Sequence, residues 1–236
     1  MNAYKHAVLG HLERLLKPHA PVDRMLDFGS GDGWYSQQLI AHGLVRYAVP
    51  VDVLLRRKTA IAPVLYDGEQ LPFEAARFDL VLAVDVLHHC PSPTKALEEA
   101  LRCCGDLFLL KDHTYTSSAG WWALALLDEV GNRRFGVPSL YRYQRDWEWT
   151  QTIEGQGFHC EQLCHPARCE PRPPLSWFVN RLQFLGLWRR SRSTAASAPE
   201  RRARSLAEGA LEREAHESRA LPETHDGTSR GRLAAS

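Results

Sequence analysis

The sequence lacks a continuous apolar run of 18 residues, so we expect no segment of it to cross a membrane as a helix. It also lacks an excess of charge of either sign, because 29 Lys and Arg residues stand against 28 Asp and Glu residues and the formal net charge is +1. A balanced charge gives no bulk attraction to nucleic acid or to an anionic membrane. We therefore expect no nucleic-acid partner. Residues 1–19 contain no apolar signal-peptide core, and for that reason we expect a cytoplasmic protein.

The cysteines do not form a metal-binding pattern. Six are present, and two of them, Cys160 and Cys164, lie near His159 and His165. A structural zinc site usually shows two tight pairs of Cys or His ligands, each with a turn between its members. Here the residues fall in an expected strand and the loop after it. We interpret the cysteines as reduced thiols and predict no metal site.

Short apolar segments alternate with helical patterns over the first half of the chain. Segments that are nearly continuous in hydrophobic residues are typical of parallel strands buried on both faces. The expected strands are 24–28, 47–53, 63–66, 78–84 and 106–111, and the expected helices are 3–17, 34–42, a segment that opens at Arg56, and 94–102. This alternation predicts an α/β fold, with a doubly wound, mostly parallel sheet and helices on both of its faces.

The rhythm changes in the second half of the chain. We expect a helix over 121–130 and strands over 158–164 and 181–188, with a helix as the alternative for the last segment. Residues 191–236 contain no aromatic residue and no Ile, Val, Met or Cys. Such a segment cannot bury enough apolar surface to offset the entropy of ordering. The prediction is one domain over 1–190 and a disordered tail over the remaining residues.

The strongest chemical signal is a glycine-rich turn, Asp27-Phe28-Gly29-Ser30-Gly31-Asp32-Gly33, between an expected strand and an expected helix. Glycines let the backbone turn sharply and approach a ligand where a Cβ would collide. Asp52 ends the second expected strand, where an acid can accept hydrogen bonds from both hydroxyls of a ribose. A purely structural turn is the alternative, but the strand, the helix and the acid together favour a nucleoside site.

Charge near this turn discriminates between nucleoside ligands. A dinucleotide places its diphosphate at the helix N-terminus, where negative charge is unfavourable. Asp27 and Asp32 put negative charge around the turn. That charge suits a cationic ligand, such as a sulfonium that also carries an ammonium group, and favours S-adenosylmethionine over NAD.

Four motifs, in order, resemble those of the class I S-adenosylmethionine-dependent methyltransferases, in particular the small-molecule group that includes ubiquinone-biosynthesis methyltransferases. The motifs are 26–33, 51–53, 67–73 and 78–89, and the match covers about residues 20–115. The resemblance implies a Rossmann-like sheet of seven strands with the last strand antiparallel. It also implies an enzyme that transfers a methyl group from S-adenosylmethionine to a small-molecule acceptor.

The resemblance further assigns cofactor contacts to individual residues. Its cofactor-binding residues in this chain are Asp27, Gly29, Gly31, Gly33, Asp52, Asp67, Gly68, Glu69 and Asp85. The three glycines of the turn would pass beneath the cofactor, and Asp27 would order the loop or hold the methionine end through water. Asp52 would accept the ribose hydroxyls, and Asp85 would face the methionine part. The adenine amine would meet Asp67 or Glu69, for which a solvated turn is the alternative.

Histidines follow the fourth and fifth expected strands, at the edge of a parallel sheet where ligands bind. Methyl transfer from a sulfonium is an in-line displacement, which requires alignment and sometimes a base that removes a proton. His113, preceded by Asp112, is the first candidate base, and His88 is the second. A capping or hydrogen-bonded histidine is the alternative for each of them.

Aromatic residues are concentrated over 114–157, which we interpret as an insertion that forms the acceptor pocket. They are Trp121, Trp122, Tyr141, Tyr143, Trp147 and Trp149. Aromatic side chains serve as core as often as pocket wall. Arg133, Arg134 and Arg142 could bind an acidic acceptor or form a solvated face, and residues 175–188 could make a weak peripheral membrane contact.

Two other functions stay open on the sequence alone. One is a catalytically inactive module that keeps the cofactor fold for partner contacts, and the other is an RNA or protein methyltransferase. The residues after the fourth expected strand, Asp85-Val86-Leu87-His88, differ from the Asn-Pro-Pro-Tyr type of motif that some amino-methylating enzymes carry there. The sequence predicts neither the identity of the acceptor nor the oligomeric state.

Overall fold

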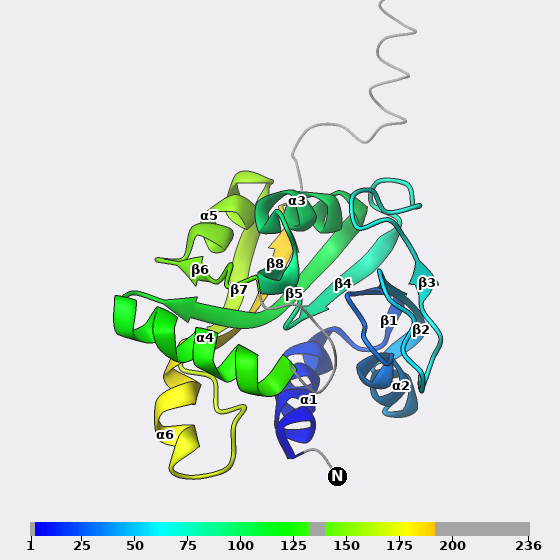
Figure 1. Cartoon of the computed structure of the whole chain (residues 1–236). Coiled ribbons are helices and arrows are strands. Elements are labelled where there is room, and N and C mark those ends of the chain that lie inside the picture. The colour runs from blue at the N-terminus through cyan, green and yellow to red at the C-terminus, as the bar shows by residue number, and fades with distance from the viewer. Residues whose placement is uncertain (1–2, 133–139, 192–236) are drawn as a thin grey trace, which may run out of the picture. The chain divides into compact units, whose positions relative to one another are not determined.

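A computed structural model describes residues 3–132 and 140–191 of the chain (Figure 1). The predicted disordered tail lies outside these residues except for Ser191, and so do Arg133 and Arg134. Within the described part, no helix is both long enough and apolar enough to span a bilayer.

The core of the molecule is a twisted sheet whose main path has the order β3-β2-β1-β4-β5-β8-β7. Its strands are β1 (Val22–Phe28), β2 (Val45–Asp52), β3 (Val64–Leu65), β4 (Phe78–Val84), β5 (Cys104–Tyr115), β7 (Phe158–Cys164) and β8 (Gln183–Arg190). The first five are parallel, whereas β8 runs antiparallel to both β5 and β7. The parallel strands and the antiparallel last strand confirm the predicted, mostly parallel sheet. A two-residue strand, β6 (Gln144–Arg145), pairs with the end of β5.

Helices cover both faces of the sheet, as predicted (Figure 1). The longer ones are α1 (Ala3–Leu16), α2 (Trp34–Ala41), α3 (Pro93–Cys103), α4 (Ser118–Asn132) and α5 (Glu148–Gly155), and a short helix is α6 (Leu175–Val179). Single 3₁₀ turns lie at η1 (Lys17–His19), η2 (Leu87–His89) and η3 (Asn180–Leu182). Helices α1 and α2 pack on one face, and α3 and α5 pack on the other.

Two hydrophobic clusters, one on each face, explain why the strand sequences are almost continuously apolar. Side chains alternate between the faces of a strand with a period of two. In β5, Phe108 and Leu110 join the cluster under α3 and α5, whereas Leu107 and Leu109 join the cluster under α1 and α2. All four side chains are at most 3% exposed. The central strands are therefore buried on both faces, as their composition indicated.

The structure corrects one predicted element and resolves one alternative. The expected helix from Arg56 does not form; the chain there makes bends, and the N–H of Ala60 donates to the carbonyl of Asp32 over 2.6 Å. Pro63 follows too closely for several helical turns. For the last segment both interpretations hold in part, because η3 ends at Leu182 and β8 begins at the next residue.

Candidate functional site

The strands β1, β2, β4 and β5 all end at the same edge of the sheet, which we call the carboxyl edge. Strand β1 lies between β2 and β4, so the order of the strands reverses between β1 and β4. In open α/β sheets, ligands bind outside the carboxyl ends at such a reversal. The loops that follow β1 and β4 therefore occupy the expected place for a ligand site.

The glycine-rich turn after β1 has a left-handed backbone at each of its glycines. The φ angles of Gly29, Gly31 and Gly33 are 69°, 61° and 68°. A Cβ added to Gly29 would lie 2.1 Å from Val86, and one on Gly33 would lie 2.4 Å from the carbonyl oxygen of Ile61, so packing against the protein itself requires those two glycines. A Cβ on Gly31 would meet no atom within 4 Å of the protein. Gly31 therefore leaves space for a ligand.

Two polar groups of this turn suit a bound nucleoside. The Oγ of Ser30 is buried and has no hydrogen-bond partner among the described residues. Asp52, at the end of β2, accepts the N–H of Gly31 over 2.8 Å with Oδ2 and the N–H of Leu54 over 3.0 Å with Oδ1. A carboxylate has about four acceptor positions, so these two bonds leave capacity for ribose hydroxyls. The residues at the turn fit the expected cofactor.

Asp27 ties β1 to the first turn of α2 rather than facing solvent. The hydroxyl of Ser36 donates to Oδ2 of Asp27 over 2.7 Å, and Asp27 is 2% exposed. Burial raises the pKa of Asp27 to about 6, against the opposing effect of the Ser36 hydrogen bond. This contact agrees with the loop-ordering role among the two that were predicted.

Asp32 forms an ion pair that the sequence analysis did not predict. The Nζ of Lys5, in the first turns of α1, lies 2.7 Å from Oδ2 of Asp32. The negative charge used above to separate a sulfonium from a diphosphate is therefore largely compensated within the protein. The charge of Asp32 therefore does not separate the two ligands, and the glycine turn and Asp52 indicate a nucleoside site in general.

The loop from Asp67 to Glu69 lies beside the end of β2. A Cβ added to Gly68, whose φ is 86°, would lie 3.3 Å from a side-chain carbon of Val53. The Oδ1 of Asp67 accepts the N–H of Glu69 over 2.8 Å and the N–H of Gln70 over 3.0 Å, and these bonds lower the pKa of Asp67. Asp67 is exposed and shapes its own turn, while its second oxygen stays available at the carboxyl edge.

Asp85, just after β4, is held by two residues from other elements. Its carboxylate accepts from the fully buried Nζ of Lys111 over 2.5 Å and from the hydroxyl of Tyr4 over 2.7 Å. Burial alone would raise the pKa of Asp85, but Lys111, His113 and His88 together outweigh burial and lower the pKa. Asp85 is therefore a charged, fixed group at the site, with a backbone φ of 51°.

His88 and Asp112 form the Asp–His pair of this edge, which differs from the Asp112–His113 pair that sequence adjacency suggested. The Nδ1 of His88 lies 2.5 Å from Oδ1 of Asp112, and both side chains are at most 2% exposed. Burial lowers the pKa of His88, but the charges of Asp112 and Asp128 outweigh burial and raise it.

His113 lies next to this pair. Its ring packs edge-on against the ring of His88, with centroids 5.0 Å apart. Its Nδ1 is 3.5 Å from Asp112 and 3.7 Å from Asp85, and it makes no hydrogen bond within the described part of the chain. Burial and then Lys111 lower the pKa of His113, so its imidazole is neutral near pH 7.

Helix α4 and Tyr143 lie against the two histidines. The hydroxyl of Tyr143 donates to Oδ2 of Asp128 over 2.6 Å, and Oδ1 of Asp128 lies 3.8 Å from Nε2 of His88. The Tyr143 ring is 5.6 Å from the His88 ring. One part of the predicted insertion, Ser118 to Tyr143 as far as it is described, thus reaches the carboxyl edge.

Three tryptophans of that segment lie away from the two histidines. Trp149, in α5, is 2% exposed and belongs to the hydrophobic core on one face of the sheet. Trp147 packs edge-on against Phe184 with centroids 5.3 Å apart. Trp122 is 68% exposed on α4. Residues 148–155 are the helix that connects two strands, and Trp149 is core rather than pocket wall.

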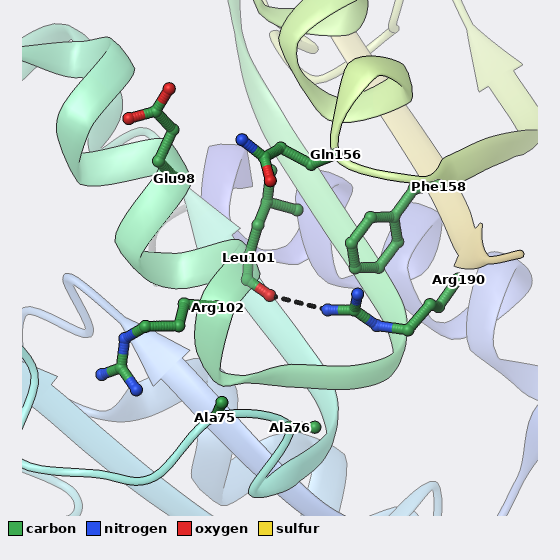
Figure 2. Close-up of a pocket in the computed structure, with 8 residues that line it drawn as sticks. All are labelled: Ala75, Ala76, Glu98, Leu101, Arg102, Gln156, Phe158 and Arg190. Atoms are coloured by element: carbon green, nitrogen blue, oxygen red, sulfur yellow. Dashed lines mark hydrogen bonds between the residues drawn. The ribbon is translucent and has the colours of Figure 1, made fainter. Parts of the chain in front are cut away.

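A cavity of about 490 Å³ lies away from these residues, at the opposite edge of the sheet (Figure 2). Figure 2 shows it between the end of α3, the start of β7 and Arg190. The guanidinium of Arg190 donates to the carbonyl of Leu101 over 3.0 Å, and that of Arg102 pairs with Glu99. Both arginines of the cavity wall are therefore already paired within the protein. The cavity also lies at the amino ends of the parallel strands, where ligands of such sheets do not bind.

Three residues of the site were missed at the sequence level. Tyr4 and Lys5 counted only as part of an amphipathic helix, and Asp128 counted only as the end of an apolar one. Each of them meets partners at least 27 positions away in the sequence. No spacing rule signals such contacts.

Comparison with known proteins agrees with this geometry. A family model described as a methyltransferase domain matches residues 26–106. A tRNA U34 carboxymethyltransferase of Campylobacter curvus is 28% identical over 142 residues, which are 54% of this chain and 46% of the relative. A protein of Methanocaldococcus jannaschii with no assigned function is 32% identical over 92 residues, 37% of this chain and 42% of the relative. The chain thus spans less than half the length of these curated relatives.

Solved structures share the fold. The S-adenosylmethionine-dependent methyltransferase of Mesorhizobium loti superposes with a TM-score of 0.58 at 17% identity, over 78% of this chain and 98% of that one. The matched family region contains the glycine turn, Asp52, Asp67 and Asp85, and the sheet around it has the strand order of that fold. Residues 26–106 match a methyltransferase domain, and the described part of the chain has the fold of a solved S-adenosylmethionine-dependent methyltransferase.

Proposed function

We propose that this protein transfers the methyl group of S-adenosylmethionine to a small-molecule acceptor that binds at the carboxyl edge, next to α4. The proposal rests on the hydrogen bond between Gly31 and Asp52. This bond places a carboxylate that can accept the ribose hydroxyls of the cofactor beside Gly31, where an added Cβ would meet open space. The cofactor supplies an electrophilic methyl group on a sulfonium. The residues of the chain bind it, orient the acceptor and receive a proton.

Cofactor binding is assigned to the turn and to the acids at the strand ends. Asp52 accepts the ribose hydroxyls, and the buried Oγ of Ser30 gains the partner that it lacks among the described residues. Asp67 or Glu69, with Gly68, meets the adenine amine. Asp85 faces the methionine part, where its ion pair with Lys111 fixes its position.

Proton removal is assigned to His113. A base must be neutral before the reaction, and burial together with Lys111 lowers the pKa of His113. The Nδ1 of His113 makes no hydrogen bond within the described structure that protonation would break. When the acceptor gains the methyl group, its proton would pass to the imidazole of His113, and Asp85 and Asp112, 3.7 Å and 3.5 Å from its Nδ1, would stabilise the imidazolium. His88 is the second candidate, but its ring is 2% exposed.

A small molecule is favoured as the acceptor because the polar groups that would meet it are largely buried. His88 is 2% and Asp128 13% exposed at the side chain, which suits a ligand enclosed between the sheet edge and α4. The Campylobacter relative is named for a tRNA, so an RNA acceptor is the second candidate. It requires a nucleotide to enter the same enclosed space.

The test is a transfer assay with S-adenosylmethionine labelled in its methyl group. Purified protein is incubated with a metabolite extract and, separately, with bulk tRNA from the same cells. We expect label in the small-molecule fraction, and none with a Gly31→Val variant. Label in the tRNA alone would show that the acceptor is an RNA and not a small molecule. Tight cofactor binding with no transfer to either pool would favour the inactive binding module.

A further inference from the structure

We propose that His88, His89 and Asp128 bind a divalent transition-metal ion, zinc by the chemistry of its ligands, at the carboxyl edge. Each residue offers one ligand atom, and these three atoms all lie within 4.8 Å of one another. Two imidazoles and one carboxylate are a ligand set typical of catalytic zinc, which keeps a fourth position open. The binding of the ion does not depend on the proposed function; its role in catalysis does.

The distance between His88 and Asp128 needs only a small adjustment. Zinc lies about 2.0–2.1 Å from nitrogen and oxygen ligands, so two ligands of a tetrahedral ion are about 3.3 Å apart. The Nε2 of His88 and Oδ1 of Asp128 are separated by 3.8 Å. A shift of about half an ångström, within the reach of side-chain rotation, would bring both into contact with one ion.

His88 is already oriented as a ligand. Its Nδ1 donates to Asp112 over 2.5 Å, which leaves the lone pair of Nε2 pointing toward Asp128. Asp112 is in turn fixed by the N–H groups of Leu87 over 3.1 Å and His113 over 2.8 Å. A carboxylate that orients a histidine from its far nitrogen is the usual support of a metal ligand.

Asp128 has the same kind of support. The hydroxyl of Tyr143 donates to Oδ2 of Asp128 over 2.6 Å, so Oδ1 is the oxygen that faces His88. With His88 in this tautomer, Nε2 and Oδ1 both present lone pairs to each other. A proton on His88 or a metal ion between the two atoms would offset the repulsion of these lone pairs.

His89 favours the metal ion over the proton. Its ring centroid is 4.0 Å from that of His88, and its Nδ1 is buried without a hydrogen-bond partner among the described residues. An unsatisfied buried nitrogen costs about 1–3 kcal/mol. A proton shared by His88 and Asp128 would leave that cost in place, whereas a metal ion bound by the Nδ1 of His89 would remove it.

The second set of clustered ligands has a supporting role. Asp112 and His113 form a group with His88, but Asp112 already uses Oδ1 to hold His88. We therefore place the ion on the side of α4. Its open position would take a hydroxyl or carboxylate oxygen of the acceptor. The ion would lower the pKa of a bound hydroxyl, whose proton leaves to His113 before the oxygen attacks the methyl group.

Metal binding is tested on tag-free full-length protein with Co²⁺ in place of Zn²⁺ and without S-adenosylmethionine. We expect one ion per chain, with the visible absorption of a four-coordinate Co²⁺ site, displaced by Zn²⁺. Asp128→Asn and His89→Gln should each weaken binding by at least about a hundredfold, and Tyr143→Phe by about tenfold to a hundredfold. His159→Ala, on the exposed surface of β7, is the matched control and should bind like the unaltered protein.

The outcomes separate this inference from the proposed function. Far-ultraviolet circular dichroism and cofactor affinity establish that each variant is folded. A protein that binds S-adenosylmethionine but binds no Co²⁺ or Zn²⁺ at micromolar concentrations overturns the metal site alone. Equal metal affinity in the folded Asp128→Asn variant also overturns it. Metal binding without methyl transfer overturns the proposed function and leaves the site intact.

Discussion

The backbone N–H of Gly31 donates to Oδ2 of Asp52 over 2.8 Å, so the end of β2 holds the glycine turn that follows β1. The two residues are 21 positions apart in the sequence. Asp52 has its second oxygen on the N–H of Leu54. The carboxylate is thus fixed in place before a ribose binds, so cofactor binding carries little entropic cost for ordering the Asp52 side chain.

Asp52→Ala should weaken S-adenosylmethionine binding by about 2 kcal/mol or more, a factor of about 30, because charge-assisted hydrogen bonds to the ribose are lost. Isothermal titration calorimetry measures this loss. The control is Asp23→Ala, which removes an exposed acid paired with Arg46 over 3.0 Å at the other end of β1. Equal affinities of the two variants would show that Asp52 only braces the turn.

Substitutions of Gly31 and Gly29 should separate binding from folding. Gly31→Val places a side chain in open space, so its folding cost is limited to the left-handed backbone, about 1–2 kcal/mol, while cofactor binding is lost. Gly29→Ala brings a Cβ within 2.1 Å of Val86 and should lower the melting temperature more. Calorimetry and thermal unfolding of both variants check this. A Gly31→Val variant that binds the cofactor normally would place the ligand elsewhere.

Asp27→Asn should stabilise the unliganded protein at alkaline pH. The folded pKa of Asp27 is raised to about 6, so the carboxyl favours folding below its unfolded pKa of about 3.9, and this contribution is lost as the pH rises through 6. An Asn keeps an acceptor for Ser36 and cannot ionise. The gain in unfolding free energy should reach as much as about 3 kcal/mol at about pH 8 and fall to about half of that near pH 5.

Urea unfolding at the two pH values measures the effect of Asp27→Asn. The Ser36→Ala variant is a useful comparison, because it removes the hydrogen bond that opposes the rise in pKa. If the Asn variant were less stable than the original protein at both pH values, the buried carboxylate would be better solvated than its surroundings indicate.

Trp149→Ala and Trp122→Ala should differ sharply although both residues lie in the segment expected to form a pocket. Trp149 is 2% exposed in the core, and its truncation should cost about 3–5 kcal/mol of unfolding free energy. Trp122 is 68% exposed, and its truncation should change stability by no more than about 0.5 kcal/mol. Chemical denaturation of the two variants decides this, and similar losses would mean that α4 is packed more tightly than its exposure shows.

The sheet was predictable because the composition of each buried strand identifies it in the sequence. Strands buried on both faces are almost wholly apolar, and the predicted strand over 78–84 coincides with β4. The glycine turn was predictable for a related reason, because glycines with φ near 65° are required by local geometry. The helix expected at Arg56 failed because the loop instead bonds to Asp32.

The polar contacts of the site were much less predictable. Asp112 and His113 are neighbours in the sequence, and the Nδ1 of His113 lies 3.5 Å from Oδ1 of Asp112. The shorter contact of Asp112 is nevertheless with the ring of His88, 24 positions earlier, at 2.5 Å. Asp128 reaches the same cluster only because α4 packs there, which depends on tertiary structure that no local pattern encodes.

The first turns of α1 have a practical consequence for anyone who purifies this protein. Tyr4 and Lys5 contact Asp85 and Asp32, so two acids at the carboxyl edge are held by the first turns of α1. An affinity tag or fusion partner joined there would stand only a few residues from the ligand site. A histidine tag in that position would also compete for the ions whose binding is to be measured.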